Sequence, residues 1–555
     1  MLYTCCMPAV HLVEVEKKYT ADDDVQIPSL TELVLRDGSS AVDGGGPVVE
    51  GEPVQQELTA TYFDTADLRL AAAGLTLRRR TGGDDAGWHL KVPAGGNARS
   101  EVRLPLGRAW RTVPQTLRKM VRAHSRGVSL QAVAEIATDR TVRRLLDATG
   151  QVLVEVADDR VTARRISAPA EGEGKGKGGD KGGGKGGKST ADGAGAAMSW
   201  REIEVELAGG AAELLDAVDV RLREQGLSSA RDSSKLARVL SGGGAESARP
   251  GKGKSKGSSG KLTARSGAGA VVLAHIREQV EQIRNQDLPV RLDAADSVHK
   301  MRVATRRLRS ALTTFKPLFE AEVVRPLRGE LKWLASELGA ARDAEVMRDR
   351  VAATVGGDED AAAATSASVV EELDQAYRDA HDRVLAELDG ERYHRLLASL
   401  DSLVTAPPVT SRAAKRAGTV LPPLVGRSYT VVRRLVEEAE AAPTGAEREE
   451  LLHDARKSAK AARYAGESVA RVFGSDATAF AEAMEAVQEA LGEHQDSVLI
   501  RERLRARGLA AADVETAFLY GRLHALEEAR SERSQHRFDD AWKAAGRKKL
   551  HRWTR

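Results

Sequence analysis

Apolar and polar residues alternate in short stretches through the first 240 residues of the chain. An alternation with period two is typical of β-strands that are buried on one face only. Apolar residues at helical spacing interrupt this pattern over residues 117–121, 130–138 and 211–225. We therefore predict a β-rich domain over residues 9–240, with helices beside its strands. The predicted strands have the sequences LVEVEKKY, ELTATYFD, LTLRRRT, GWHLKVP, SEVRLPL, VLVEVADD and WREIEVELA.

From residue 269 onward, apolar residues recur every three to four positions almost to the end of the chain. This periodicity is typical of amphipathic helices. We predict an all-α bundle over residues 269–550, so the whole chain is expected to be an α+β multidomain protein. Proline or paired glycine is expected to break the helices near Pro317, Gly356, Pro407, Pro422 and Pro443.

Two segments rich in Gly, Lys and Ser interrupt both patterns, over residues 168–198 and 241–268. Segments of this composition bury too little apolar surface to fold on their own. Strand-like sequence resumes directly after the first segment, so we predict a disordered insertion there. We interpret the second segment as a flexible linker between the two domains.

The chain has 555 residues, 41% of them hydrophobic, and a formal net charge of +3. This length suits two or more domains, and the small charge means that basic residues must attract a ligand locally. The only cysteines, Cys5 and Cys6, are adjacent, which gives no sign of a structural disulfide. With no signal peptide and no long apolar segment, we expect a cytoplasmic protein that does not contact membranes.

Carboxylates gather on one face of two predicted strands. Glu14 and Glu16 alternate with apolar residues near the start of the chain, and Lys18 follows on the same face. Glu202, Glu204 and Glu206 do the same on a later strand, with Ile203, Val205 and Leu207 opposite. Like charges on one face repel one another. A divalent cation, Mg²⁺ or Mn²⁺, would relieve that repulsion.

Cations are carried by other predicted strands, at Arg78, Arg80, Lys91, Arg99, Arg140 and Lys235. If the sheet closes into a barrel with a polar interior, these side chains meet the carboxylates there. Cations would then bind phosphate oxygens, and the metal would bridge to them, as phosphoryl transfer requires. The simpler interpretation is an amphipathic sheet whose charged face meets solvent.

The sequence Glu14-x-Glu16-x-Lys18 resembles the element that opens the CYTH domain, also called the triphosphate tunnel metalloenzyme fold. YFDT at 62–65 resembles a second landmark of that family. The basic and acidic strands named above follow in the family's order over about residues 9–240.

This resemblance implies an eight-stranded antiparallel β-barrel tunnel with flanking helices, which hydrolyses triphosphates with a divalent metal. By this resemblance, the expected metal ligands are Glu14, Glu16, Glu204 and Glu206, with Glu202 as a further candidate. It implies that Lys18 and Arg78, Arg80, Lys91, Arg99, Arg140 and Lys235 bind phosphates, and that Glu14, Glu16 and Lys18 serve catalysis. The nucleophile would be a water molecule.

A basic motif appears twice in the predicted helical domain. In both copies a His is followed by basic residues three, seven and ten positions later. The first copy comprises His299, Arg302, Arg306 and Arg309, and the second comprises His453, Arg456, Lys460 and Arg463. Leu338-Gly339 and Asp343 follow the first copy, and Leu491-Gly492 and Asp496 follow the second. The two elements repeat at offsets of 154 and 153 residues, which predicts an internal duplication.

On an α-helix the four side chains of each copy lie within about 80° of arc. Met301, Ala304, Leu308 and Leu312 then lie opposite the first stripe and face the bundle. Like charges at this spacing repel one another, and a bound polyanion would turn the repulsion into attraction. Alternatively, the basic side chains of a stripe could form ion pairs with acidic residues of neighbouring helices. Nucleic acid is disfavoured because exposed aromatic residues do not accompany the basic ones.

The blocks VHKMRVATRRLRSAL, LGAARDAEVM, LHDARKSAKAARY and LGEHQDSVL resemble the CHAD domain, an α-helical module, over about residues 269–550. That resemblance implies binding of inorganic polyphosphate by the basic helices, with association to polyphosphate granules in the cytoplasm, and it implies no catalysis there. Asp343 and Asp496 would orient basic side chains.

Two other functions stay open at this point. The tunnel could carry out adenylate cyclase-type chemistry on ATP, which other CYTH-like proteins perform. The whole chain could instead be a non-catalytic scaffold that binds polyphosphate. The sequence leaves the preferred substrate, the metal and the oligomeric state undecided.

Overall fold

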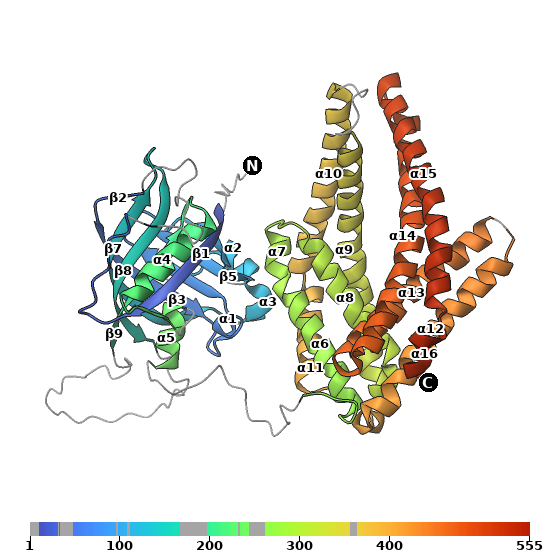
Figure 1. Ribbon diagram of the computed structural model, residues 1–555, viewed down its shortest axis with the longest axis horizontal. Helices are drawn as coiled ribbons and strands as arrows, with labels where there is room; N and C mark the ends of the chain where they lie inside the picture. The colour runs from blue at the N-terminus through green and yellow to red at the C-terminus, as the bar shows by residue number, and fades with distance from the viewer. Residues whose placement is uncertain are drawn as a thin grey trace, which may run out of the picture. The chain divides into compact units, whose positions relative to one another are not determined.

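The computed structural model of the chain divides into two compact units, Met1–Gly257 and Ser258–Arg555 (Figure 1). It describes residues 10–31, 33, 48–95, 98–107, 112–166, 197–230, 234–242, 261–355, 363–443 and 445–555. Most of the predicted insertion over 168–198 and most of the predicted linker over 241–268 lie outside the described residues. No helix in the described part of the chain is long and apolar enough to cross a membrane.

The N-terminal unit is built on one antiparallel sheet whose described part has ten strands. The strand order is β10-β1-β6-β5-β4-β3-β7-β8-β9, and β2 pairs with β7. The sequence predicted eight strands; two of these ten are only two residues long. The strands are β1 (Val10–Ala21), β2 (Val49–Glu50), β3 (Val54–Asp64), β4 (Thr76–Thr81), β5 (Gly87–Gly95), β6 (Ala98–Leu104), β7 (Gln131–Leu146), β8 (Val152–Arg165), β9 (Met198–Leu207) and β10 (Ser228–Ser229).

The sheet curls until its last long strand meets its first. β1 pairs with β6 along its first half, from Val10 opposite Arg103, and with β9 along its second half, from Glu16 opposite Glu206. β9 is the last strand of the path, and β1 lies next to the two-residue β10 at the other end, so the pairing of β1 with β9 joins the two ends of the sheet. Strands this long twist strongly, and the twist brings the ends of a sheet together.

The outer face of the curled sheet is apolar and is covered by helix α4 (Ala212–Glu224). Ile203 and Val205 of β9 pack there with Leu214, Val218 and Leu222 of the helix, all fully buried. The alternating partners of Ile203 and Val205 are the glutamates of β9, which therefore point to the inner face. The sheet buries its apolar face outward against helices and turns its charged face inward. The other helices of this unit are α1 (Arg69–Ala72), α2 (Gln115–Met120), α3 (Arg122–Ser125) and α5 (Lys235–Ser241).

The helix predicted over 130–138 is wrong, because these residues belong to strand β7. Its buried residues Ala134, Ile136 and Thr138 alternate with more exposed ones, as on a half-buried strand. β7 pairs with β3 on one side and β8 on the other. Hydrogen bonds to two neighbours outweigh the helical spacing of the short apolar run. Helices do form near the other two predicted places, as α2 and α4.

The C-terminal unit is helical throughout its described residues, apart from two isolated β-bridges and the turns. Figure 1 shows α9 beside α10 and α14 beside α15 as long antiparallel pairs. Its elements are α6 (Ala268–Asn285), α7 (Asp287–Arg291), α8 (Ser297–Thr314), η1 (Lys316–Leu318), α9 (Ala321–Val355), α10 (Ala363–Asp389), α11 (Glu391–Thr405), η2 (Ser411–Ala414), α12 (Ala417–Ala441), α13 (Ala446–Phe473), α14 (Ser475–Ala510), α15 (Val514–Ala545), α16 (Lys548–His551) and η3 (Arg552–Thr554).

Helix α12 corrects one prediction, because it continues through Pro422 and Pro423, where the sequence predicted a break. Proline removes a helix hydrogen bond, which is a local cost. Leu421, Leu424 and Val425 around the pair are buried in the bundle, and this packing outweighs the local cost. The predicted breaks near Pro317, Pro407 and Pro443 do lie outside the α-helices, while Gly356 is not among the described residues.

Candidate functional site

A cavity of about 290 Å³ lies on the inner face of the curled sheet. Among the described residues that line it, Val142 is the one aliphatic side chain. Cationic side chains outnumber carboxylates there by nine to six, so the cavity favours an anion. The cations are Lys18, Arg78, Arg80, Lys91, Arg99, Arg103, Arg140, Arg144 and Lys235, and the acids are Glu16, Asp84, Asp85, Glu155, Glu204 and Glu206.

The strand register places three carboxylates in a row across the sheet. Glu16 of β1 is directly opposite Glu206 of β9, and Glu206 is directly opposite Glu155 of β8. Directly opposite residues on antiparallel strands share a face, and all three line the cavity. Burial raises the pKa of Glu206, with Lys91 opposing and Glu16, Glu204 and Glu155 adding to the rise. We call Glu16, Glu206 and Glu155 the glutamate row.

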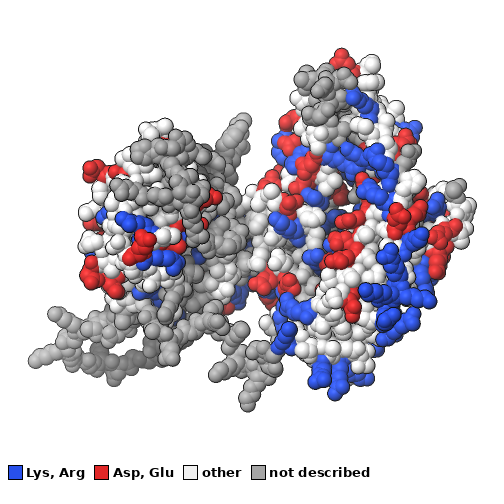
Figure 2. All heavy atoms as spheres, viewed as in Figure 1, with Lys and Arg blue, Asp and Glu red and all other residues white. Residues whose placement is uncertain are grey.

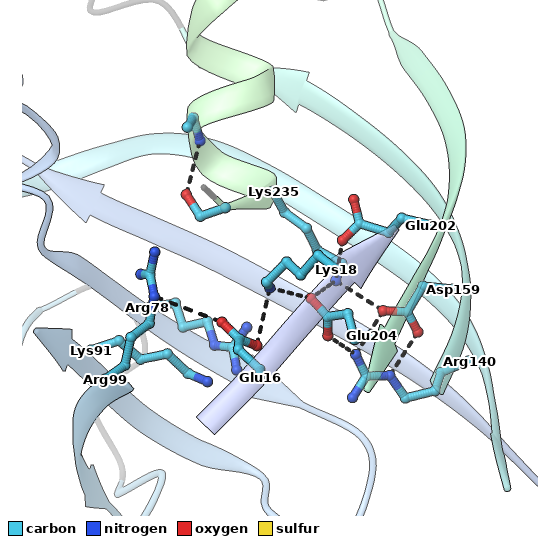
Figure 3. A network of polar contacts seen from close by, with 12 residues as sticks. Glu16, Lys18, Arg78, Lys91, Arg99, Arg140, Asp159, Glu202, Glu204 and Lys235 are labelled. Carbon is cyan, nitrogen blue, oxygen red and sulfur yellow. Dashed lines mark hydrogen bonds and ion pairs between the residues drawn. The ribbon is translucent and has the colours of Figure 1, made fainter. Parts of the chain in front are cut away.

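Lys18 lies beside this row and pairs with carboxylates of both β1 and β9 (Figure 3). Its Nζ atom is 3.2 Å from Glu16 Oε2 and donates a short hydrogen bond to Glu204 Oε1. Lys18 is directly opposite Glu204 in the register of the two strands. The described part of the element ExExK therefore places the carboxylate of Glu16 and the ammonium of Lys18 along one wall of the cavity. The side chain of Glu14 lies outside what the structure describes.

A second acidic group lies next to Lys18, formed by Asp159, Glu202 and Glu204 (Figure 3). One oxygen of each carboxylate lies within 4.8 Å of the others, which is the arrangement that a hard divalent cation needs. We call these three residues the acidic cluster. Asp159 and Glu202 are almost fully buried, with 0% and 5% of their surface exposed. These residues can hold a metal ion by the chemistry of their oxygen donors.

Arg140 and Lys235 neutralise the acidic cluster. Arg140 donates from Nε and Nη2 to the two oxygens of Asp159, at 2.7 and 2.6 Å, and from Nη2 to Glu204 Oε2 at 2.7 Å. Burial by itself raises the pKa of Glu204, but Lys18, Lys235 and Arg140 outweigh burial and hold that pKa well below its usual range. The carboxylate of Glu204 therefore stays ionised in the folded protein.

Arg78 and Arg80 lie side by side on β4 and face the cavity. The Nε atoms of both are buried and have no hydrogen-bond partner among the described residues. Burial, followed by repulsion from Arg78 and Arg140, lowers the pKa of Arg80 to about 9, although Asp85 contacts its guanidinium. A bound anion would satisfy these donors and relieve the repulsion.

Glu101 of β6, the strand beside β1, organises the neighbouring part of the wall and was not among the predicted site residues. Its carboxylate is fully buried and contacts His89 Nδ1 at 2.9 Å and Lys91 Nζ at 3.7 Å. Arg99 of the same strand lies 3.7 Å from Glu16, so β6 bridges this wall to the glutamate row. The alternation of Arg99, Glu101 and Arg103 in the sequence was the available signal. Asp159 was missed too, although it shares a strand face with Glu155.

The acidic residue of the YFDT element, Asp64, supports the fold and does not line the cavity. Asp64 is fully buried, and its carboxylate accepts backbone hydrogen bonds from Thr65, Leu70 and Ala71 at 2.7, 2.9 and 2.9 Å. These bonds fix the turn that leads from β3 into α1. Tyr62 of the same element does line the cavity, where Arg78 Nη1 lies 3.5 Å from its hydroxyl.

In the C-terminal unit, the first basic stripe lies on α8 and the second on α13. Met301, Ala304, Leu308 and Leu312 are buried opposite the first stripe, which confirms the predicted apolar face. The two helices contact each other, with Arg307 Nη2 2.9 Å from Glu467 Oε2. Burial lowers the pKa of Arg306, and Arg302, Arg309 and Arg456 lower it further by repulsion. Residues of the two stripes therefore lie near one another.

In each of the two repeats, an arginine of the basic stripe packs against the glycine of the Leu-Gly element. A Cβ atom at Gly339 of α9 would lie 3.4 Å from Arg302 Nε, and one at Gly492 of α14 would lie 3.2 Å from Arg456 Nη2. Glycine thus leaves room for a guanidinium against the backbone of the next helix in both places. Asp343 lies 3.9 Å from Arg302, while the side chain of Asp496 is outside what the structure describes.

Acidic partners already bind part of the second stripe. Arg463 lies 2.7 Å from both Glu467 and Glu485. Figure 2 shows groups of Lys and Arg on this unit with acidic side chains between them. The alternative in which a stripe pairs with neighbouring acidic helices therefore holds for Arg463. A hollow of about 570 Å³ next to Arg456 is lined also by Arg350 and Arg530.

The comparison with known proteins matches the two units to two families. The model of the CYTH domain matches residues 48–238, and the model of the CHAD domain matches residues 274–505. Among solved structures, one described as PptA from Streptomyces chartreusis has a TM-score of 0.43 and 21% identity, and covers 50% of this chain and 100% of that chain. The CHAD domain from the plant Ricinus communis has a TM-score of 0.42 and 23% identity, with coverages of 52% and 95%.

Two curated proteins of Mycobacterium tuberculosis, from strains CDC 1551 and H37Rv, resemble the chain over nearly its whole length. Both carry names that describe them only as uncharacterized, and each is 37% identical over 546 residues, which is 96% of either chain. CYTH proteins are typically metal-dependent enzymes that act on triphosphates. By these matches, the chain belongs to the family of proteins in which a CYTH domain is followed by a CHAD domain.

Proposed function

We propose that the N-terminal unit is a metal-dependent triphosphatase that hydrolyses inorganic triphosphate or short polyphosphate. The observation that carries the proposal is the division of the cavity wall, with the glutamate row on one side and Arg78 and Arg80 on the other. Three carboxylates directly side by side repel one another unless a cation lies between them. The buried Nε atoms of Arg78 and Arg80 have no hydrogen-bond partner among the described residues, so both guanidinium groups could donate to a bound anion.

Glu16 and Glu206 would hold the divalent cation, with Glu14 as a further ligand that the sequence suggests. The sequence suggests Glu202 and Glu204 as ligands too, but both side chains lie beside the ammonium group of Lys235. The ion, Mg²⁺ or Mn²⁺, would neutralise phosphate charge and polarise the bond that breaks. Oxygen ligands suit both ions, and the residues do not discriminate between them.

The chain's own residues bind and orient the phosphates. Arg78, Arg80 and Lys91 line the cavity as phosphate-binding groups, and Arg99 and Arg140 hold carboxylates in place beside them. The attacking water would be held by the metal or by a carboxylate, and a carboxylate of the cavity would accept its proton. The water oxygen would bond to the terminal phosphorus, and the bridging P–O bond would break to release phosphate and diphosphate.

The cavity favours an inorganic over a nucleoside triphosphate. Its lining is mostly charged, and the one tyrosine there, Tyr62, has only 2% of its surface exposed. A nucleobase needs an apolar or aromatic surface on which to stack. Adenylate cyclase-type chemistry on ATP is therefore less well supported than hydrolysis.

For the C-terminal unit we propose polyphosphate binding along the stripes on α8 and α13. The repulsion among Arg302, Arg306, Arg309 and Arg456 supports the proposal, because a polyanion would convert it into attraction. Each charged hydrogen bond gained would contribute about 1.5–3 kcal/mol. His299, His453, Lys460 and Arg463 complete the stripes that the sequence defines.

The shared spacing and the two Gly–Arg contacts support an internal duplication. Polyphosphate binding would hold the enzyme on cytoplasmic polyphosphate granules.

The direct test is release of phosphate from triphosphate, ATP and long polyphosphate by the full chain with Mg²⁺ or Mn²⁺. We expect metal-dependent release from triphosphate and loss of it in Glu16→Gln and Glu206→Gln variants. The matched control is Lys17→Gln, since Lys17 lies on the outer face of β1 and pairs with Asp216 of α4. Release that persists in both glutamate variants, or cyclic AMP formed from ATP, would contradict the assignment.

A further inference from the structure

The ammonium group of Lys235 lies at the centre of the acidic cluster (Figure 3). Its Nζ atom is 2.8 Å from Asp159 Oδ2, 2.7 Å from Glu202 Oε1 and 2.8 Å from Glu204 Oε1. All three contacts are ion pairs, and the one with Glu204 Oε1 is also a hydrogen bond. The side chain has only 7% of its surface exposed. The three oxygens that would suit a divalent cation therefore already surround a cation that is part of the chain.

Two features of the fold fix Lys235 in this place. Helix α5 begins at Lys235, and the hydroxyl of Ser234 caps it by accepting a hydrogen bond from the backbone N–H of Ala237 at 3.1 Å. Leu236 and Val239 of the helix are buried among residues of β3, β7 and β8. The lysine is thus directed into the cluster by a packed helix and not by a free loop.

The charges of the cluster are balanced without a metal. Asp159, Glu202 and Glu204 meet Lys235, Arg140 and Lys18, so three carboxylates face three cations. Two carboxylates of the glutamate row are paired as well, Glu16 with Lys18 and Arg99 and Glu155 with Arg144, but Glu206 at its centre lies directly opposite both of them. A divalent cation at the acidic cluster would meet the ammonium at close range, and both cannot use the same three oxygens.

We propose that Lys235 is a built-in substitute for a second metal ion, which excludes divalent cations from the acidic cluster and restricts them to the glutamate row. The proposal deepens the proposed function, since it rests on the row as the metal site of the tunnel. It implies that the tunnel works with one divalent cation and one ammonium where a two-metal site would hold a pair of ions.

The test counts Mn²⁺ ions bound to the full chain without any phosphate, from the loss of the EPR signal of free Mn²⁺. We expect one tight site per chain in the wild type. A Lys235→Met variant should gain a second site, and a further Glu202→Gln change should remove that second site. Lys17→Met serves as the matched control, since it removes a lysine from the outer face of β1. A folded Lys235→Met variant with one site would overturn the proposal.

A second measurement does not depend on the folding of that variant. In the otherwise wild-type chain, Glu206→Gln should weaken Mn²⁺ binding about tenfold or more, whereas Glu202→Gln should leave it unchanged within about twofold. Equal weakening by both changes would show metal in the acidic cluster and would overturn the proposal. Because no phosphate is present, these results stand apart from the hydrolysis assay. A chain that binds Mn²⁺ as expected but releases no phosphate would refute only the proposed activity.

Discussion

Arg140 of β7 and Asp159 of β8 are directly opposite each other and are joined by two hydrogen bonds, of 2.7 and 2.6 Å. The carboxylate of Asp159 is fully buried, and that of Glu204 lies within reach of the same guanidinium at 2.7 Å. A bidentate pair of this kind fixes the geometry of both partners. Arg140 therefore holds two carboxylates of the cavity in place, in addition to the phosphate binding that the family resemblance implies for it.

Replacing Arg140 with Met should therefore destabilise the N-terminal unit. The change removes two hydrogen bonds from the buried carboxylate of Asp159 and leaves it with Lys235, so we expect a cost of up to about 3–5 kcal/mol. The control is Arg164→Met, which breaks an exposed ion pair between the same two strands, with Glu135, and should cost about 0–1 kcal/mol. Urea unfolding of both variants measures the difference. Equal effects would mean that burial does not strengthen the Arg140 pair.

Substituting the two glycines that lie against arginines of the basic stripes should weaken polyphosphate binding without destabilising the helices. Gly492→Ala places a methyl group 3.2 Å from Arg456 Nη2, so this guanidinium must shift slightly. Gly339→Ala places one 3.4 Å from Arg302 Nε, in close contact with that guanidinium, so its effect should be smaller. Alanine favours helix, so stability should hold. Affinity for polyphosphate should fall by up to about tenfold for each change, as expected for one weakened charged hydrogen bond. Calorimetric titration with polyphosphate measures it.

The control for these glycine variants lies on the same helix as Gly339. Gly329 of α9 has no atom within 4 Å of the position that a Cβ would take. Gly329→Ala should therefore leave polyphosphate affinity unchanged. If all three variants bind equally well, the guanidinium positions over Gly339 and Gly492 do not matter for the ligand.

The acidic cluster predicts how stability depends on pH. The pKa of Glu204 is held well below 4.5 in the folded protein, and that of Asp159 is lowered from 3.8. Carboxylates with lowered pKa values stabilise the fold above the pKa of the unfolded chain, and this contribution is lost as the pH falls through the folded pKa. The melting temperature should thus drop below about pH 4.5.

A Glu204→Gln variant should be less stable than the wild type at neutral pH and should approach it as the pH falls from about 4.5. Glu135→Gln, which alters an exposed pair, is the comparison. Thermal unfolding between pH 3 and 7 tests the expectation. A constant difference between wild type and Glu204→Gln across this range would count against ion pairing as the source of the stability.

Arg306 and Arg463 should respond in opposite directions to the same substitution. Burial, followed by repulsion from neighbouring arginines, lowers the pKa of Arg306, so Arg306→Met should raise the melting temperature and weaken polyphosphate binding. Arg463 lies between Glu467 and Glu485, so Arg463→Met should lower the melting temperature. Stability traded for function in this way is common at binding sites. A lower melting temperature for Arg306→Met would contradict the proposed repulsion.

Much of the cavity could be predicted from alternation alone. Glu16, Lys18, Glu204, Glu206, Arg78, Arg80 and Lys91 were expected to converge, and all line one cavity. Period two fixes which side chains share a strand face, and the buried apolar partners Ile203 and Val205 fix which face turns outward. Register was not predictable, because it depends on which strands become neighbours. The position of Glu155 directly opposite Glu206 therefore could not be predicted, because it depends on the pairing of β8 with β9.

The sequence by itself determined that charged and apolar faces alternate on the strands, that two basic stripes repeat on helices, and that the chain has a β-rich part followed by a helical part. Local periodicity is enough for these features, because each residue's face depends on its neighbours along the chain. Only the tertiary structure decided that β7 is a strand, that α12 runs through Pro422 and Pro423, and that Lys235 points into the acidic cluster. These outcomes depend on contacts between residues far apart in the sequence, whose burial and pairing energies exceed the local preferences.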